Sequence, residues 1–476
     1  MPIVIAAAVP HPPLIVPGVG HGREREIQST VDAYRKVARR IAALEPDTIV
    51  ISSPHTAMYL DYLHVAPGPG ARGTFAQFGD VADGSRVTYD EELVATLCRL
   101  AQEEGLPAGT AGERERELDW GILVPLHFIQ DAYAELRAAG HEPAPYRVAR
   151  MGISGLSPLQ HYRMGQLVAR AAERLGRRVA YVASGDLSHK LAADGPYGFS
   201  PDGPAFDELA CRALGSGAFL ELLTADPGLC ERAAECGLRS FQIMAGTLDR
   251  TPVTAELLSY EGPFGVGYGV TCFSPSGAAG SDPARAFGEA YEAWHAADMG
   301  RRRAGEDAYV ALARASLEHR VRTGRHLELP QGLPPELCSR RAGAFVSLKK
   351  NGQLRGCIGT IAPTRASLAE EIAANAVSAG LHDPRFPPVT KDELPELVYD
   401  VDVLGTPEPV SGPEGLDPRR YGVIVSAPGG RRGLLLPDLD GVDTVDEQLR
   451  IAARKGGVDL AEPGVQIERF VVERHE

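Results

Sequence analysis

The chain has 476 residues, and its 44% hydrophobic and 24% charged residues are typical of a globular protein with more than one core. Its 63 acidic and 49 basic residues give a net charge of −14, which argues against nucleic acid as a partner because a phosphate backbone needs clustered positive charge. The seven cysteines form no C-x-x-C pair and no apolar run reaches about 18 residues, so we expect a cytoplasmic protein without disulfide framework, zinc ribbon or membrane contact.

The first half of the chain alternates short apolar runs with amphipathic stretches. Short apolar runs bounded by polar or Pro-rich loops predict buried strands, and apolar residues at helical spacing predict helices. This alternation predicts an α/β domain with a largely parallel central sheet. In chain order we expect a strand at 3–9, a helix at 25–44, a strand at 47–51, helices at 90–104 and 161–176, and a strand at 178–183.

A stretch rich in Pro, Ser and Gly at 274–285 marks a change of composition and predicts a linker. Helical patterns resume at 286–297 and 307–322, and strands and helices continue towards the end of the chain. Asn351-Gly352 favours a tight type I′ turn between two of these strands. The sequence therefore predicts an N-terminal domain at 1–274, a linker at 275–302 and a C-terminal domain at 303–476.

A histidine follows each of three predicted strands, namely His11, His55 and His189. Ligands of an open α/β sheet bind outside the carboxyl ends of its parallel strands, which is where these loops would meet. A single loop histidine can simply satisfy backbone groups, but three after the same kind of element are better explained by a shared site. We therefore expect the three imidazoles to converge on one metal ion or one substrate.

Several acidic residues are candidates to complete such a site. Two histidines and one carboxylate leave open positions on Fe(II) for a substrate and O₂. Asp186 lies three residues before His189 and is either a ligand or a partner that orients the imidazole. Glu235 precedes an apolar helical stretch, where carboxylates are common as helix caps, and Glu261 fits a plain turn. The residues alone leave this choice open.

Five segments spread over the first domain form a recognisable set: Pro10-His11-Pro12-Pro13, Ser53-Pro54-His55, Val124-Pro125-Leu126, Ser184-Gly185-Asp186-Leu187-Ser188-His189 and Glu235-Cys236-Gly237-Leu238-Arg239. With them, this domain resembles the LigB-like class III extradiol dioxygenases and their Memo relatives, and the whole chain resembles the fused AmmeMemoRadiSam proteins. The resemblance implies Fe(II), or zinc or another divalent metal, held by His11, His55 and Glu235. Memo-type relatives have a cysteine in the last segment, so Cys236 is an alternative ligand. The family's general acid/base role falls on His189, since imidazole exchanges protons near neutral pH.

One segment departs from the pattern of the dioxygenases, which often have Asp-His-Gly before Val-Pro-Leu. This chain has Asp119-Trp120-Gly121 instead. Trp120 is therefore either a packed core aromatic or a residue beside the substrate. His127, farther along the same stretch, is either structural or a second candidate. Together with Asp186 and Cys236, these two residues form the outer set of candidates around metal and substrate.

The resemblance implies a non-haem Fe(II) dioxygenase that uses O₂ to open the ring of a catecholic or related small aromatic substrate. An alternative keeps the metal but not the ring cleavage, as an accessory protein of a radical-SAM-linked modification pathway, which the fusion and Trp120 favour. A third hypothesis is an interaction protein with a vestigial site. The sequence leaves open whether the chain forms a homo-oligomer.

The C-terminal part carries three further motifs: Ala344-Phe345-Val346-Ser347-Leu348-Lys349-Lys350-Asn351-Gly352, Leu354-Arg355-Gly356-Cys357-Ile358-Gly359-Thr360 and His382-Asp383-Pro384-Arg385-Phe386-Pro387-Pro388. They resemble the AMMECR domain, which implies an α+β fold without an established activity. Arg355 and Cys357 share one face of a strand, and an adjacent Arg would lower the pKa of the thiol. We expect either that Cys357 is a small core residue or that it forms an anion-binding or reactive pocket with Arg355, His382 and Arg385.

Overall fold

The computed structural model describes residues 1–114, 117–410, 412–439 and 441–476. The chain divides into two compact units, Met1–His295 (unit 1) and Ala296–Glu476 (unit 2). The division falls within the segment 275–302 that the sequence predicts as a linker, and a helix, α10 (Phe287–Gly305), forms there.

Unit 1 has ten strands among its described residues and helices of very different length. Its strands are β1 (Ile3–Val9), β2 (Thr48–Ser53), β3 (Leu63–His64), β4 (Gly70–Thr74), β5 (Gly84–Thr88), β6 (Ala108–Gly109), β7 (Arg147–Gly152), β8 (Val179–Ser184), β9 (Val253–Glu261) and β10 (Tyr268–Pro275). Its helices before α10 are α1 (Pro17–Gly20), α2 (Gln28–Leu44), α3 (Glu91–Glu103), α4 (Trp120–Ala138), α5 (Pro158–Leu175), α6 (Asp202–Ser216), α7 (Phe219–Leu223), α8 (Pro227–Ala233) and α9 (Leu238–Thr247).

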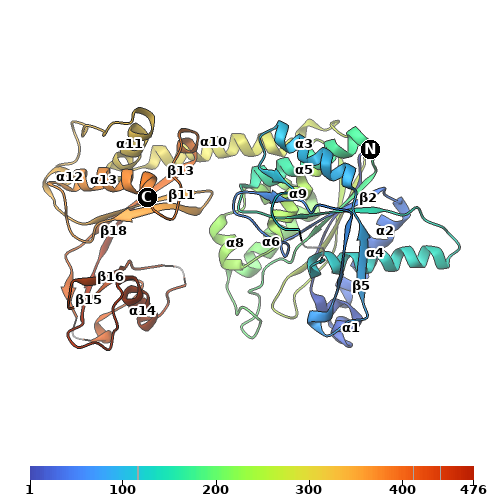
Figure 1. Ribbon diagram of the computed structural model, residues 1–476, viewed down its shortest axis with the longest axis horizontal. Coiled ribbons are helices and arrows are strands. Elements are labelled where there is room, and N and C mark those ends of the chain that lie inside the picture. The colour runs from blue at the N-terminus through green and yellow to red at the C-terminus, as the bar shows by residue number, and fades with distance from the viewer. Residues whose placement is uncertain (115–116, 411, 440) are drawn as a thin grey trace. The chain divides into compact units, whose positions relative to one another are not determined.

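A six-stranded sheet with the order β7-β2-β8-β1-β10-β9 forms the centre of unit 1. The four strands β7, β2, β8 and β1 are parallel to their neighbours, whereas β10 is antiparallel to β1 and β9 is antiparallel to β10. In Figure 1, α3, α5 and α9 lie on one side of this sheet, and α2 and α4 lie on the other. The prediction of an α/β domain with a largely parallel central sheet is confirmed.

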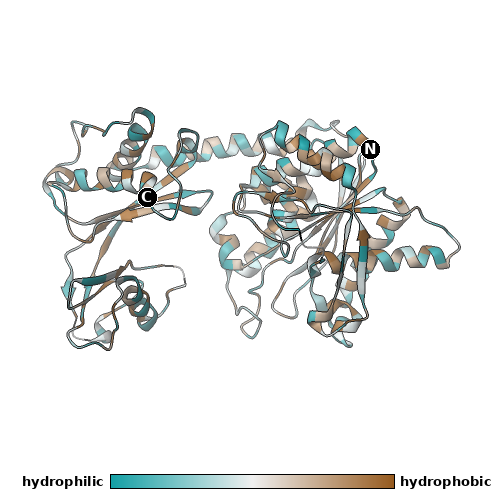
Figure 2. Cartoon of the chain, viewed as in Figure 1, coloured by the Kyte–Doolittle hydropathy of each residue, from teal (hydrophilic) through white to brown (hydrophobic). Residues whose placement is uncertain are grey.

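Alternate residues of the central strands enter two different hydrophobic cores. Ala6 and Ala8 of β1 pack with α3, α5 and α9, whereas Ile5, Ala7 and Val9 pack with α2 and α4. Both faces of a parallel sheet are covered by helices, so its strands are apolar on both faces instead of alternating with polar residues. Figure 2 shows this as brown strands at the centre and mixed teal and brown helices around them. This double burial explains why the predicted strands are continuous apolar runs.

Local signals account for several helix boundaries. Helix α5 begins with a capping box, in which the Ser157 hydroxyl accepts the Gln160 N–H and the Gln160 side chain accepts the Ser157 N–H. It ends at Gly176, whose φ of 63° suits a residue without Cβ. Helix α2 begins later than predicted, because residues Arg23–Ile27 form a 3-10 helix ahead of it.

Unit 2 contains two antiparallel four-stranded sheets, with the orders β12-β11-β13-β18 and β14-β17-β15-β16. This arrangement with adjoining helices is compatible with the α+β fold that the sequence predicts. Its strands are β11 (Ala344–Lys350), β12 (Gln353–Gly359), β13 (Leu397–Leu404), β14 (Glu408–Pro409), β15 (Gly422–Ala427), β16 (Arg431–Leu435), β17 (Gln466–Phe470) and β18 (Val472–His475). Its helices after α10 are α11 (Ala308–Thr323), α12 (Pro335–Ser339), α13 (Leu368–Leu381) and α14 (Val445–Gly456).

The predicted hairpin between β11 and β12 is present. Asn351 and Gly352 both have positive φ, 53° and 77°, as a type I′ turn requires. Within the described part of the chain, no helix combines the length and the apolar character that crossing a bilayer requires.

Candidate metal centre

Three neighbouring strands of the central sheet deliver the candidate residues. Strand β8 lies between β2 and β1, and all three are parallel. Their carboxyl ends therefore lie at the same edge of the sheet. His11 follows the end of β1, His55 follows β2, and Asp186 and His189 follow β8. The sheet thus explains why residues far apart in the sequence are close in space.

His11 is buried at this edge of the sheet. It is only 2% exposed, and its N–H donates to Asp186 Oδ1 over 2.8 Å. Its Nδ1 lies 3.0 Å from the Ser184 hydroxyl, so Nε2 is the nitrogen turned towards the other candidates. Burial, and next the charge of His189, lowers the pKa of His11 to about 3. The imidazole is therefore neutral at physiological pH, as a metal ligand must be.

His55 faces His11 directly. The two Nε2 atoms are 2.9 Å apart, and the rings meet edge to face. Burial, and then the nearby His11 and His189, lowers the pKa of His55 to about 3. The indole of Trp120, the first residue of α4, stacks on the His55 ring with centroids 3.9 Å apart. Trp120 thus contacts a candidate ligand and also packs against the core on the α2 and α4 side of the sheet.

Asp186 and His189 lie on the other side of His11. Asp186 Oδ2 is 3.9 Å from His11 Nε2 and also 3.9 Å from His189 Nε2. Burial raises the pKa of Asp186 to about 6. His189 Nδ1 lies 2.5 Å from the Ala234 carbonyl, which accepts only from an N–H. Nδ1 therefore carries the proton, and Nε2 is left as the basic nitrogen turned towards Asp186.

Cys236 contacts both His11 and Asp186. Its Sγ is 3.7 Å from His11 Nε2 and accepts the Asp186 N–H over 3.3 Å. Among the described residues, two groups have ligand atoms within 4.8 Å of one another: His11, His55 and Cys236, and also Asp186, His189 and Cys236. A Cβ added to Gly185 would come within 2.2 Å of Gly237 Cα, so the absence of side chains lets these two loops meet.

Glu235 belongs to neither group. Its carboxylate accepts the Leu238 N–H over 2.7 Å at the start of α9, which is a helix-capping contact. Burial raises its pKa to about 7. Glu261, the other open alternative, accepts both the N–H and the hydroxyl of Thr30, each over 2.6 Å. The structure thus brings Cys236, and neither of these glutamates, within ligand distance of His11 and His55.

His127 is not part of the cluster. Its Nδ1 lies 2.8 Å from Asp83 Oδ2, and its ring contacts Phe128 edge to face. These contacts fit the structural role that the sequence left open for it.

Two residues that support the centre, Ser53 and Asp207, are not among those that the sequence predicts for the site. The Ser53 hydroxyl accepts the His55 N–H over 3.1 Å and donates to Asp119 Oδ1 over 2.7 Å. Asp207 Oδ1 accepts the Ser188 N–H over 2.7 Å and so holds the loop that carries His189. Ser53 lies within a motif that was recognised only for its histidine. No local pattern marks Asp207, because its partner lies 19 residues away.

The donor set at His11, His55 and Cys236 fits a metal ion. The two neutral imidazoles turn their Nε2 atoms towards each other, and an ion can accept a lone pair from both. Burial raises the pKa of the Cys236 thiol well above its usual range, and a metal would supply the positive charge that ionises it. Imidazole and thiolate are ligands of transition metals, whereas Mg²⁺ and Ca²⁺ prefer oxygen.

The candidate residues of unit 2 are engaged with carboxylates. Arg355 forms two hydrogen bonds with Glu393, of 2.9 and 3.1 Å, and Arg385 forms three with Asp383 through its side chain and its N–H. The prediction that Arg355 lowers the pKa of Cys357 is wrong, because burial raises it.

Cys357 nevertheless forms two hydrogen bonds that fix its position in the sheet. Its Sγ accepts the Ser347 hydroxyl over 3.2 Å, and its N–H donates to Asp383 over 2.9 Å. His382 donates its N–H to Ser378 at the end of α13. Asp383 and Glu393 balance the two guanidinium charges, whereas the Lys455 ammonium interacts with Cys357 and Arg385 as a further positive charge. The predicted pocket stays a prediction.

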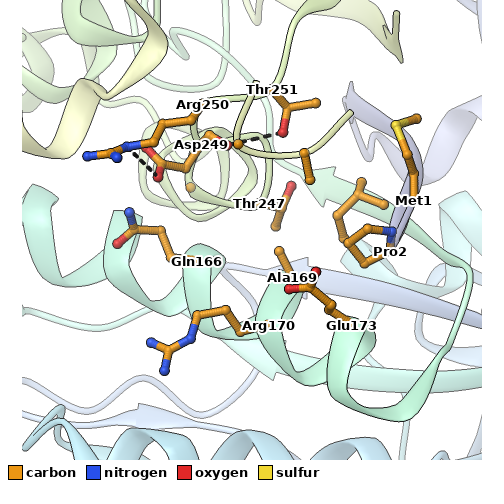
Figure 3. Close-up of a pocket in the computed structure, with 14 residues that line it drawn as sticks. Met1, Pro2, Gln166, Ala169, Arg170, Glu173, Thr247, Asp249, Arg250 and Thr251 are labelled. Atoms are coloured by element: carbon orange, nitrogen blue, oxygen red, sulfur yellow. Dashed lines mark hydrogen bonds and ion pairs between the residues drawn. The ribbon is translucent and has the colours of Figure 1, made fainter. Parts of the chain in front are cut away.

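Unit 1 also has hollows outside the cluster. One of about 310 Å³ lies between Met1, α5 and the end of α9, with Gln166, Asp249 and Arg250 around it (Figure 3). It adjoins Ile3 at the start of β1, whereas His11 follows the other end of that strand. This hollow is therefore remote from the candidate metal centre.

Comparisons with known proteins match the two units separately. Residues 5–271 match the family of the catalytic LigB subunit of aromatic ring-opening dioxygenase, and residues 310–475 match AMMECR1. A protein of Clostridium acetobutylicum is 40% identical over 478 residues, which cover 98% of each chain. A protein of Thermotoga maritima is 55% identical over 172 residues, which cover 36% of this chain and 98% of that protein.

Two solved structures resemble parts of the chain. An uncharacterised protein of Pyrococcus horikoshii is 33% identical, covers 35% of this chain and 88% of its own, and has a TM-score of 0.33. An uncharacterised protein of Escherichia coli is 16% identical, covers 57% of this chain and 99% of its own, and has a TM-score of 0.37. The family matches and the full-length relative together show that the chain belongs to the LigB family of aromatic ring-opening dioxygenase subunits and carries an AMMECR1 domain fused behind its LigB domain.

Proposed function

We propose that unit 1 is a metal-dependent oxidoreductase in which His11, His55 and Cys236 hold one transition-metal ion, with Fe(II) as the leading candidate. The observation that carries this proposal is the convergence of two neutral imidazoles and a thiol to within 4.8 Å at the carboxyl edge of the sheet. Two neutral ligands and one thiolate would leave a divalent ion with one positive charge. That charge suits an anionic group such as the oxygen of a phenol or catechol.

A redox-active ion bound here would bring O₂ and a phenolic substrate together, in line with the ring-opening dioxygenases of the family. The protein's own contribution begins with His189. Its Nδ1–H is fixed on the Ala234 carbonyl, which leaves Nε2 free to accept a proton from a substrate hydroxyl. Asp186, 3.9 Å from that nitrogen, would then stabilise the positive charge of the imidazolium.

The surroundings of the cluster support this role for His189. The ring of Tyr197 contacts the His189 ring edge to face at 5.4 Å and is 62% exposed. His189 itself is partly exposed, whereas His11 is buried. His55 is partly exposed as well, so a substrate from solvent would reach His189 or His55 before His11, which would stay as a buried ligand.

A second candidate function keeps the metal without ring cleavage. Two observations favour it: the third group near His11 and His55 is the thiol of Cys236 and not a carboxylate, and Trp120 covers one face of the His55 ring. The chain would then bind metal as an accessory of another enzyme, and a link to a radical SAM protein stays a prediction.

The ligand set is tested by metal content. The protein is purified without oxygen, loaded with Fe(II), and analysed by elemental mass spectrometry. We expect one iron per chain, a loss of iron in Cys236→Ala and His55→Ala, and retention in the matched variant Glu235→Gln. Iron lost from Glu235→Gln but kept in Cys236→Ala would contradict the proposed set.

The activity is tested with an oxygen electrode and a panel of catechols. We expect metal-dependent O₂ consumption together with a new absorbance of the opened ring. The variant His189→Ala should keep its iron and lose most of the turnover, by about 10²–10⁴-fold for a general base. Iron that binds tightly while no catechol consumes O₂ would reject ring cleavage and favour the accessory role.

A further inference from the structure

A second hollow of unit 1 lies against the metal centre. It measures about 520 Å³, and its lining includes His55, Trp120, Glu113, Glu117, Asp119 and Arg150. Its volume lies within the range of about 300–1,000 Å³ that small-molecule sites occupy. Because His55 is both a candidate ligand and part of this wall, a molecule in the hollow would lie next to the metal centre.

The charges in this wall do not balance. Arg150 is 4% exposed, donates to Glu113 Oε2 over 3.2 Å and to the Glu117 carbonyl over 2.9 Å. Its charge also acts on Asp119, where it partly offsets the rise in pKa that burial causes. Among the described residues that line the hollow, one guanidinium thus faces three carboxylates, those of Glu113, Glu117 and Asp119. A bound cation would meet a favourable field here, and a carboxylate would be repelled.

Buried acceptor atoms without a hydrogen-bond partner also favour a bound cation. Asp119 Oδ1 takes the Ser53 hydroxyl, but Asp119 Oδ2 is buried without a hydrogen-bond partner, and so is Glu113 Oε1. Buried acceptors are normally paired, so these two atoms call for a donor. Burial also raises the pKa of Asp119, and a positive group nearby would restore its charged form.

A metal ion explains these features less well than an organic cation does. The groups of potential metal ligands found among the described residues do not include Glu113, Glu117 or Asp119. A single ion would fill only a small part of the hollow. The indole of Trp120 also contributes an apolar wall, which suits a molecule with a carbon skeleton.

We propose that this hollow selects substrates that carry a protonated primary amine, which Asp119 and Glu117 bind while the aromatic part extends along Trp120 towards His55. The inference rests on the proposed function, because it treats the metal centre as the place of reaction. It assigns the substrate class: small phenols with an ammonium group, and not phenols with a carboxylate.

The test measures binding and not turnover. Metal-loaded protein is titrated without oxygen by calorimetry with tyramine, 4-ethylphenol and 3-(4-hydroxyphenyl)propionate, which share a phenol and differ in the charge of the side chain. We expect tyramine to bind about tenfold more tightly than 4-ethylphenol, as a charge-assisted hydrogen bond would give. The propionate should bind most weakly. Equal affinities, or tightest binding of the propionate, would overturn the proposal.

Charge-removing variants locate the effect. Asp119→Asn and Glu117→Gln should each weaken tyramine binding several-fold and leave 4-ethylphenol unchanged. Glu117 is exposed, so this variant carries little risk for folding if Asp119→Asn perturbs His55. The matched control is Glu208→Gln, an exposed acid on α6 outside the hollow, which should not change any of the three affinities. Unchanged tyramine binding in both hollow variants would reject the assignment.

The two proposals fail separately. An amine preference that depends on Asp119 and Glu117, found in a protein that consumes no O₂, would retain the binding site and reject the oxidoreductase. O₂ consumption that is indifferent to the charge of the phenol would do the opposite.

Discussion

The Ser53 hydroxyl couples the position of His55 to a buried carboxylate. It accepts the His55 N–H and donates to Asp119 Oδ1. The backbone at His55 is thereby fixed where β2 ends, and the ring is fixed by Trp120 stacked against it. Ligands held in this way need little reordering when an ion binds, and groups that orient a ligand typically change metal affinity by about 10–100-fold when they are removed.

The variant Ser53→Ala should therefore weaken metal binding by about tenfold or more while the protein still folds. Competition with a chelator of known affinity measures this change. Ser52→Ala is a matched control, because neighbouring residues of a strand point to opposite faces and Ser52 is turned away from the His55 loop. If both variants lose affinity equally, the effect comes from β2 as a whole and not from the Ser53 hydroxyl.

Asp207 should make the free energy of unfolding of unit 1 depend on pH, and one substitution can isolate this contribution. It accepts the Ser188 N–H and the Tyr260 hydroxyl, and burial raises its pKa from 3.8 to about 6. The folded protein thus holds a proton that the unfolded chain has already lost between these pH values. The stability that this proton contributes is present below about pH 4 and is lost as the pH rises through about 6.

We expect Asp207→Asn to remove this dependence, since an amide does not titrate: its Oδ1 can still accept the Ser188 N–H, and its Nδ2 can donate to the Tyr260 oxygen in place of the bond that Tyr260 now donates. A shift of about two pKa units corresponds to roughly 3 kcal/mol, which the wild type should lose between pH 4 and 6 relative to the variant. Urea unfolding followed by tryptophan fluorescence reports on unit 1, because Trp120 and Trp294 both belong to it. Parallel pH curves for the two proteins would contradict the assignment.

At the scale of residues, the sequence indicates that the histidines lie together better than it indicates which residue lies beside them. His11, His55 and His189 each follow a strand, and strand ends are visible as the limits of apolar runs. Glu235 and Cys236 are neighbours in a turn before α9, and which of the two points at His11 depends on the turn's dihedral angles. No composition or spacing encodes that choice.

Helices α5 and α9 pack against each other through glycine. A Cβ added to Gly246 would lie 1.8 Å from the Tyr162 carbonyl oxygen, and one added to Gly165 would lie 1.9 Å from the Ile243 carbonyl oxygen. The helix backbones therefore approach more closely than any side chain allows. Since the turn carrying Cys236 leads directly into α9, this packing also positions the candidate ligand.

The variant Gly246→Ala should destabilise unit 1 by about 1–3 kcal/mol or more, because the helices must separate to admit the methyl group. Gly300→Ala, on the part of α10 that belongs to unit 2, is the control for the added methyl group alone. No heavy atom lies within 4 Å of its added Cβ, so alanine should be neutral or stabilising by up to about 1 kcal/mol. Thermal unfolding followed by circular dichroism compares the two. An unchanged melting temperature in Gly246→Ala would show that the contact relaxes freely.

The spacing of hydrophobic residues predicts a helix only where a buried face and an exposed face alternate along the sequence. Helix α2 was visible because its buried residues recur at helical spacing, and the strands were visible as apolar runs. The sequence predicts no element at α4, since the first turns of this helix are buried nearly all round and contain Pro125. Without a polar face, a helix cannot be told from a buried strand by its pattern of hydrophobic residues.

At the scale of the whole molecule, the two units have separate hydrophobic cores. The cores on both sides of the central sheet are built from unit 1, whereas those around β11, β13 and α13 are built from unit 2. A ligand that binds only the folded state raises the free energy of unfolding of the cooperative unit that contains its site. A metal at His11, His55 and Cys236 should therefore stabilise unit 1 alone.

Hydrogen exchange followed by mass spectrometry can measure this for each segment. Adding Fe(II) at about 100 times its dissociation constant should stabilise unit 1 by about 2.7 kcal/mol and slow exchange in peptides covering the strand ends at 9–11, 53–55 and 184–189. Peptides from β11 and β12 should not change, and Cys236→Ala should abolish the protection. Protection of β11 and β12 as well would mean that the metal couples the two units or that unit 2 binds it too, since equilibrium protection cannot spread to a unit that opens independently.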